Sequence, residues 1–239
     1  MGRRARVRVW VHTHVPRARR WETGADDGST ADDIVQRMLK TYQSVESYVD
    51  NAQYHERYVR RDTGLEYNVP PHVVSVVYRR PNRLRLNRQV PEVDSAPLSV
   101  AVTANGQQVR AFVSDYTRQV LEYPQPDRSE LDTLIATPAL REAVLPVPIE
   151  NLYPQADLLL SSPTRPPRLF NTGIARRLPD DSLRGVPCYR VELRSDGSGA
   201  RILWIDQQSY LLRRMEMPTE QVRRAMDPEG LLHDLQLWI

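Results

Sequence analysis

The sequence predicts an α+β fold that is mostly β, with a curved antiparallel sheet packed against a few short helices. Three observations support this prediction. From residue 54 onward, apolar and polar residues alternate through most of the chain, as in half-buried strands. A single amphipathic helix precedes these strands, and no regular strand–helix alternation follows. The dipeptide Asn105-Gly106 is the strongest two-residue hairpin signal in the chain.

The helix is expected over residues 30–48. Ser29 or Thr30 can cap its first turn, where Asp32 and Asp33 place negative charge beside the exposed N–H groups. Apolar residues then recur at helical spacing, which predicts one buried face, at Ile34, Met38, Tyr42 and Val45.

A first meander of about six strands follows. The segment 83–88 alternates strictly, which places Leu84 and Leu86 on one side and the arginines on the other. The first expected strand begins at Tyr54. The others cover residues 72–80, 83–88, 98–102, 107–114 and 118–123.

Short helices are expected next, over residues 130–136, 139–145 and 155–161. The sheet then resumes with strands over 169–178, 187–193, 201–206 and 210–217, joined by turns at 183–185, 196–199 and 206–209. A short helix over 219–226 precedes the last strand, 231–239, which either closes the sheet as an edge strand or is cut from a longer chain. The two meanders can form one continuous sheet.

Charge is distributed unevenly along the chain. Residues 1–20 contain seven arginines and no acid, and without them 26 basic residues face 30 acidic ones. We therefore expect residues 1–29 to be a disordered Arg-rich arm and linker, and residues 30–239 to be the folded β domain. No aromatic platform or recognition helix accompanies the arm, so nucleic acid is not an expected partner. The arm contains no recognisable secretory signal.

No motif of known chemistry is present. The chain has no apolar run of about 20 residues that could span a membrane. Its single cysteine, Cys188, excludes an internal disulfide or a zinc cluster. The sequence also lacks a glycine-rich phosphate loop, a Gly-x-Ser-x-Gly elbow and a His-Glu-x-x-His pair. We therefore expect a non-catalytic binding domain without metal or cofactor; an enzyme would need an unseen cluster around His72 or His233.

Several segments, taken in order, resemble the periplasmic lipoprotein-carrier superfamily of the LolA/LolB type, and most closely a branch of uncharacterised bacterial predicted periplasmic proteins. The resemblance covers about residues 30–239. It is distributed over the segments 34–48, 80–85, 105–106, 116–124, 185–193, 202–206 and 211–216.

The resemblance implies an open antiparallel half-barrel, with short helices packed over its concave face as a lid on an apolar cavity. Strand parity then selects candidate cavity residues, and a one-residue slip would turn any strand's set to the other face. The candidates are Val74, Val76, Tyr78, Leu84, Leu86, Val100, Val102, Tyr189, Val191, Leu193, Trp204 and Leu211.

Two functional hypotheses follow. In the first, the chain binds a hydrophobic ligand, the acyl chain of a lipid or lipoprotein, at the bacterial cell envelope, and the periplasm is the expected location. In the second, it is an accessory domain with a filled core, which binds a protein partner or positions a fused downstream domain of thioredoxin-like redox type.

Overall fold

The computed structural model describes residues 28–89, 99–113, 119–124, 153–162, 166–170, 174–195, 199–219 and 232–239. Its strands form one antiparallel sheet in the order β6-β5-β4-β3-β2-β1-β11-β10-β9-β8-β7. The strands are β1 (Ser47–Arg60), β2 (Glu66–Arg79), β3 (Arg83–Gln89), β4 (Ser99–Ala104), β5 (Gln108–Val113), β6 (Gln119–Pro124), β7 (Ile174–Leu183), β8 (Val186–Ser195), β9 (Gly199–Asp206), β10 (Leu212–Glu216) and β11 (Leu232–Trp238). The helices are α1 (Ala31–Ser44), α5 (Pro154–Leu159) and the 3-10 turn η1 (Arg168–Phe170).

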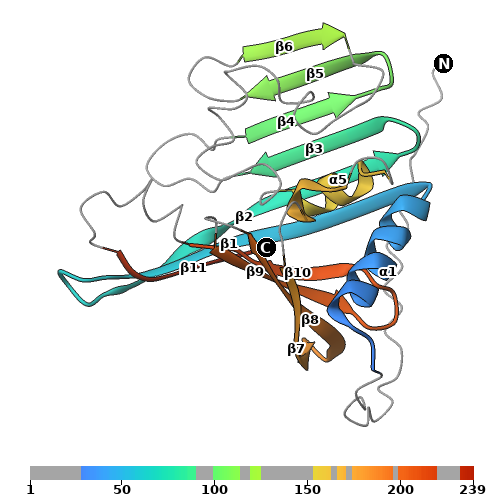
Figure 1. Ribbon diagram of the computed structural model, residues 1–239. Coiled ribbons are helices and arrows are strands. Elements are labelled where there is room, and N and C mark those ends of the chain that lie inside the picture. The colour runs from blue at the N-terminus through green and yellow to red at the C-terminus, as the bar shows by residue number, and fades with distance from the viewer. Residues whose placement is uncertain are drawn as a thin grey trace.

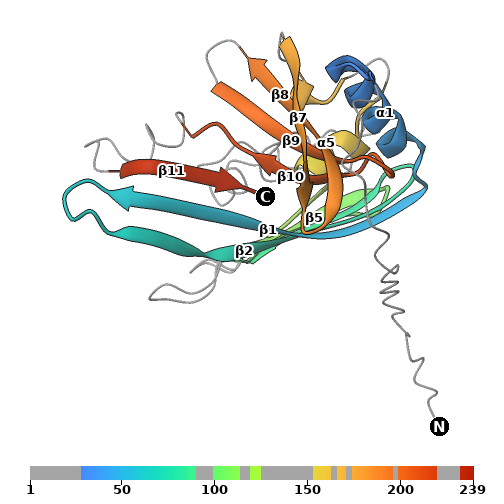
Figure 2. The same ribbon diagram turned by 90° about the horizontal axis from the view of Figure 1, so that it is seen from below.

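The sheet is strongly curved, and α1 and α5 lie on its concave face (Figures 1 and 2). The outermost strands β6 and β7 do not pair with each other, so the sheet stays open. This arrangement confirms the predicted mostly β, α+β class and the open half-barrel. It also confirms that the two meanders belong to one continuous sheet.

Helix α1 begins as the sequence predicts. Thr30 accepts a hydrogen bond from the Asp33 amide, and the Asp33 carboxylate accepts one from the Thr30 amide, which makes a capping box. Ile34, Met38 and Tyr42 are fully buried on one face of the helix.

The helix is shorter than predicted. It ends at Ser44, and β1 begins at Ser47, well before the expected strand start at Tyr54. The side chain of Arg80 closes the helix by donating to the carbonyl oxygens of Val45 at 2.7 Å and Tyr42 at 3.3 Å, and also to that of Gln43. A cation suits these last carbonyls, which have no partner within the helix.

The hairpin of β1 and β2 is also longer than predicted, because β2 starts at Glu66 and not at His72. Its register shifts between the pairs Tyr54↔His72 and Glu56↔Val69. The intervening Pro70 and Pro71 have no N–H for the ladder, and such residues are tolerated at a bulge. The prolines, which interrupt the sequence pattern, therefore lie inside a continuous strand.

The turns are better predicted than the strand ends. Asn105-Gly106 joins β4 to β5, with Gly106 at a φ of 101° and the Asn105 side chain accepting from the amides of Gln107 and Gln108. Arg184-Gly185 joins β7 to β8. The strand expected over 169–178 begins only at Ile174, after η1.

Strand β11 does not lie at an edge, as one reading of the sequence expected. It is inserted in the middle of the sheet, where it pairs with β1 over residues 55–60 and with β10 at Glu216. The alternating apolar pattern of 231–239 is common to both positions, which is why the sequence did not distinguish them. The helices expected at 130–136, 139–145 and 219–226, and the disordered arm up to residue 27, lie outside the described residues.

Replacing Arg80 by alanine should destabilise the domain, because three helix carbonyls lose their charged donor. We expect a loss of about 2 kcal/mol in the free energy of unfolding, measured by urea denaturation. The neighbouring Arg79 is exposed and provides the matched control, Arg79→Ala, which should change stability by less than about 0.5 kcal/mol. Equal losses in the two variants would contradict the capping role.

Candidate ligand site on the concave face

The concave face of the first six strands is built from rows of side chains set by the strand register. One row joins Val76, Leu86, Val102 and Ala111, and a second joins Tyr78, Leu84, Ala104 and Val109. All of these side chains are at most 3% exposed. A third row places Arg88 between Val74 and Val100. The predicted residues of the first meander therefore share one face.

The second half of the sheet continues this buried surface. Tyr189, Val191 and Leu193 of β8 are buried, and they pair with Ile205, Leu203 and Arg201 of β9. Leu211 precedes β10 and packs partly against the same core.

Trp204 departs from the predicted set. It pairs with Arg190 and not with a residue of the buried row, so its side chain lies on the opposite face of the sheet. There it stacks with Arg190, whose guanidinium carbon lies 4.6 Å from the ring centroid, and its Nε1 donates to Glu216 at 2.8 Å. A tryptophan that packs against arginine side chains can be buried on either face of a sheet. The alternation of apolar residues in the sequence therefore does not reveal which face Trp204 occupies.

In the described part of the chain, two helices lie on the concave face. Helix α1 buries Ala31, Ile34, Val35, Met38 and Tyr42, and every residue of α5 is buried. The rows described above are thus packed against protein. Besides apolar contacts, α5 is held by the Asp157 carboxylate, which accepts from the Leu169 amide at 3.0 Å, and by Gln155.

A polar cluster joins both helices to β1. The Tyr48 hydroxyl donates to Asp50 Oδ2 at 3.1 Å, and Gln155 Nε2 donates to the same oxygen at 3.0 Å. Tyr42 and Tyr48 bring their hydroxyl oxygens to 3.4 Å. Burial raises the pKa of Tyr42 to about 12 and that of Tyr48 further. Both phenols therefore stay protonated and act as neutral hydrogen-bonding groups.

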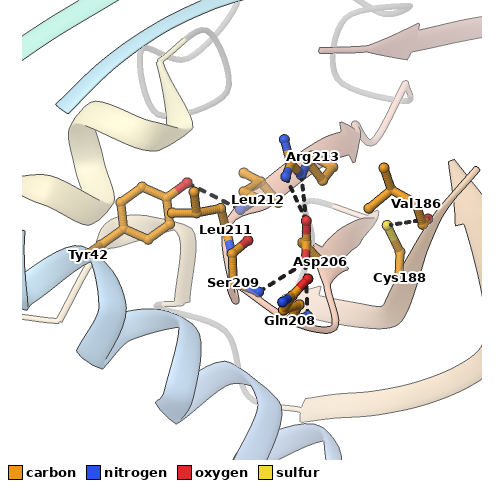
Figure 3. Close-up of polar contacts among 9 residues, drawn as sticks. All are labelled: Tyr42, Val186, Cys188, Asp206, Gln208, Ser209, Leu211, Leu212 and Arg213. Carbon is orange, nitrogen blue, oxygen red and sulfur yellow. Dashed lines mark hydrogen bonds and ion pairs between the residues drawn. The ribbon is translucent and has the colours of Figure 1, made fainter. Parts of the chain in front are cut away.

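The Tyr42 hydroxyl also reaches the tip of the β9–β10 hairpin, where it accepts from the Leu212 amide at 3.2 Å (Figure 3). The hairpin turn is closed by Asp206, whose Oδ1 accepts from the amides of Gln208 and Ser209, both at 2.9 Å. Its Oδ2 pairs with Arg213 at 2.6 Å. These contacts fix the C-terminal half of the sheet against α1.

A second polar cluster lies beside the apolar rows. Arg88 is 6% exposed, and its Nη2 lies 3.0 Å from Nδ1 of His72, which stacks on Tyr54. Burial and the charge of Arg88 together lower the pKa of His72 to about 4, so the imidazole is neutral at pH 7. Burial raises the pKa of the nearby Glu56 and of Tyr153. This cluster provides a cation within an otherwise apolar face.

Arg88 corrects the sequence interpretation, which placed the arginines of 83–88 opposite Leu84 and Leu86. Arg83 and Arg85 are exposed, but Arg88 shares the buried parity of the two leucines. Because Arg88 lies two residues after Leu86, the alternation of the strand could have predicted its burial. The sequence did not predict the position of Asp50, because the expected helix extended over Tyr48. Alternate residues counted from the observed strand start at Ser47 place Tyr48, Asp50, Ala52 and Tyr54 on one face of β1.

Cys188 is buried, and its Sγ donates to the Val186 carbonyl at 3.4 Å (Figure 3). Burial raises the pKa of this thiol to about 11, so it is protonated at neutral pH. Among the described residues, no group of three or more His, Cys, Asp or Glu side chains is placed to hold a metal ion. None of the described helices has both the length and the apolarity needed to cross a membrane.

A cavity of about 640 Å³ opens beside this face, between β1 and β10. Its lining includes Asp50, Gln155 and Trp238, and also Arg184, Arg213 and Arg214. The cavity therefore reaches α5, and its walls are polar and cationic as well as apolar.

No family model matches the sequence, and no curated protein matches it. Several solved structures do. The chain is similar to a LolA superfamily protein from Nitrosomonas europaea, with 14% identity and a TM-score of 0.29, over 79% of this chain and 71% of that one. An uncharacterized conserved protein from Thermus thermophilus matches with 12% identity and a TM-score of 0.41, over 87% and 86% of the two chains.

A third similar structure is a putative outer membrane lipoprotein-sorting protein domain from Vibrio parahaemolyticus. It shares 10% identity and a TM-score of 0.33, over 79% of this chain and 71% of that one.

His72 should make the stability of the domain depend on pH. Its pKa is about 6.5 in the unfolded chain and about 4 in the folded one, so the unfolded state binds more protons between these values. Stability contributed by neutral His72 should be complete above pH 6.5 and should be lost as the pH falls towards 4. We expect about 2 kcal/mol, because partial exposure screens the effect.

The measurement is urea denaturation of the wild type and of His72→Gln at pH 7.5 and pH 5. The variant should lose less stability than the wild type between the two pH values. An identical loss would assign the pH dependence to other groups.

Proposed function

We propose that the concave face binds the acyl chain of a lipid or lipoprotein at the bacterial cell envelope. The observation that carries the proposal is the set of continuous apolar rows across β2, β3, β4 and β5, with α5 packed on β2 at one end of these rows. With strands about 4.8 Å apart, a row from β2 to β5 is about 14 Å long. That length suits an extended acyl chain lying across the strands.

The helix that covers β2, α5, is short. Helix α5 has six residues, and isolated helices of this length do not form in water, so it owes its structure to the surface beneath it. Its polar attachments include the hydrogen bond from Gln155 to Asp50 and the one from the Leu169 amide to Asp157. Movement of α5 would expose the apolar rows without breaking the sheet.

An acyl chain could then replace the apolar side chains of the cover. Each buried methylene contributes about 0.8 kcal/mol, so eight of them contribute about 6 kcal/mol before the cost of opening the cover is subtracted. Binding and release would be passive, since the proposal includes no covalent step. The net free energy of binding is the difference between the packing free energy of the ligand and that of the cover it replaces.

Arg88 offers a site for the polar end of the ligand. Its guanidinium lies in the row between Val74 and Val100, so it is close to where an ester or carboxyl oxygen of a bound chain would lie. Neutral His72 beside it leaves the positive charge on Arg88. The other hypothesis, an accessory domain of a longer redox protein, finds no feature in the described residues that favours it.

The two faces of β2 provide a matched test. Val76 is 2% exposed on the concave face, whereas Val77 is 41% exposed on the other face. We expect Val76→Asn to weaken binding of a fluorescent fatty acid at least tenfold, because an amide must be desolvated against the chain. Val77→Asn should bind within twofold of the wild type.

Far-UV circular dichroism and thermal unfolding would verify that both variants fold, and native mass spectrometry of the purified protein would detect lipid carried from the host. The same weakening in both variants, or no uptake by the wild type, would exclude the concave face as an acyl site.

If α5 must move before the ligand binds, then weaker packing of α5 should strengthen the apparent binding of the ligand. Leu158 of α5 is fully buried, and Leu158→Ala should loosen the helix by about 2–4 kcal/mol. We expect tighter apparent binding of the same fatty acid, because a larger fraction of molecules is open. Gln36→Ala on the exposed side of α1 is the control. Unchanged or weaker binding by Leu158→Ala would show that α5 forms part of the site and does not compete for it.

A further inference from the structure

The convex face of the sheet, opposite α1 and α5, exposes apolar side chains in pairs (Figures 1 and 2). Val49 of β1 pairs with Val77 of β2, and both side chains are exposed. Phe112 of β5 pairs with Val120 of β6, and these side chains are exposed too. Isolated exposed valines need no explanation, whereas paired apolar residues on one face suit an interaction surface.

Three arginines lie on the same face. Arg79 of β2 is directly opposite Arg83 of β3, and Arg85 is directly opposite Val77. All three arginines are exposed, and in the described part of the chain no ion pair includes them. Like charges directly opposite each other destabilise a sheet. The surface therefore retains a repulsion that a bound anion would relieve.

The strand register gives the net charge of this face. Its outward positions lie on residues 47–53 of β1, residues 73–79 of β2 and strands β3 to β6. At these positions the described charged residues are the three arginines, together with Arg110 and Glu122, which form an ion pair at 3.1 Å. Four cations and one carboxylate leave a net charge of +3 on the outward positions. The convex face of β1 to β6 is therefore cationic.

The three arginines line a cavity of about 750 Å³ at the turns that join β2 to β3 and β4 to β5. The side-chain amides of Asn82, Asn105 and Gln107 line it as well, and its described lining contains no carboxylate. A cavity of this size can accept a phospholipid headgroup. Because a guanidinium can bind phosphate oxygens through two parallel N–H groups, the cavity has the donors that a phosphate needs.

We propose that the convex face docks the domain on a bilayer rich in anionic phospholipid. Arg79, Arg83 and Arg85 contact lipid phosphates, and the exposed apolar pairs enter the headgroup layer. At such a surface, electrostatic attraction adds to the burial of apolar area. Nucleic acid fits the same charge less well, because it offers no apolar layer for Val77 and Phe112. The acyl rows lie on the opposite face, so either proposal can fail while the other stands.

The test is cosedimentation of the whole chain with vesicles of phosphatidylcholine alone, or of phosphatidylcholine with one-third phosphatidylglycerol. The chain should bind the anionic vesicles at least tenfold more tightly, and a tenfold rise in salt should remove most of this difference. Inorganic phosphate at the concentration of the lipid phosphate should leave the chain bound. Full displacement by it would show a site for free anions and overturn docking on a bilayer.

Residues 1–20 contain seven arginines, so the decisive comparison is between variants that all keep this segment. Arg83→Glu should weaken binding to the anionic vesicles at least tenfold, because it removes a cation and adds an anion. The new carboxylate would lie opposite Arg79, so thermal unfolding should show a variant at least as stable as the wild type. Arg61→Glu, in the exposed turn between β1 and β2, is the matched control and should bind within twofold.

Val77→Asn tests the apolar part of the surface. It should weaken binding to the anionic vesicles at least threefold, because a buried valine is lost from the headgroup layer, whereas Val76→Asn on the concave face should bind them as the wild type does. Equal effects of Arg83→Glu and Arg61→Glu, or a loss in Val76→Asn and not in Val77→Asn, would overturn the proposal. Tighter binding of a short DNA duplex than of the anionic vesicles, lost in Arg83→Glu, would assign the face to nucleic acid and overturn it as well.

Discussion

Among the described residues, eleven strands share one sheet, and helices of 14 and six residues lie on its concave face. Apolar contact of α5 with β2, and of α1 with β7 and β8, is the interaction on which the other described features depend. It orders α5, which is too short to be stable alone. Burial on the same face of the sheet holds Arg88 and His72 in a hydrogen-bonded pair, because a buried polar group without a partner is costly. A ligand for the concave face would have to compete with the same contact.

The parts of this fold that follow from local chemistry could be predicted from the sequence. The capping box at Thr30 begins α1, and Asn105-Gly106 turns β4 into β5, because each depends on neighbours in the chain. Period-two alternation likewise placed Leu84, Leu86, Val100 and Val102 on one face. The resemblance, and not this alternation, implied the half-barrel and the covering helices.

The remaining features depend on contacts between distant segments. The end of α1 is fixed by Arg80, from the far end of the β1–β2 hairpin, so helical spacing alone extended the helix too far. Trp204 packs on the outer face between Arg190 and Arg214, which pattern reading cannot foresee. Position in the sheet is equally hidden, because a strand between β1 and β10 and a strand at an edge have the same alternation.

The central place of β11 also has a consequence for the order in which the molecule assembles. His55 and Trp238, which pair across β1 and β11, lie 183 positions apart in the chain. The hairpins on either side close over short loops and can form while synthesis continues, but the strand that joins them follows all the other described strands in the chain. Until then, a nascent chain exposes two unpaired strand edges, on β1 and β10, in the middle of its future sheet. Such intermediates, with unpaired strand edges, are prone to associate with one another.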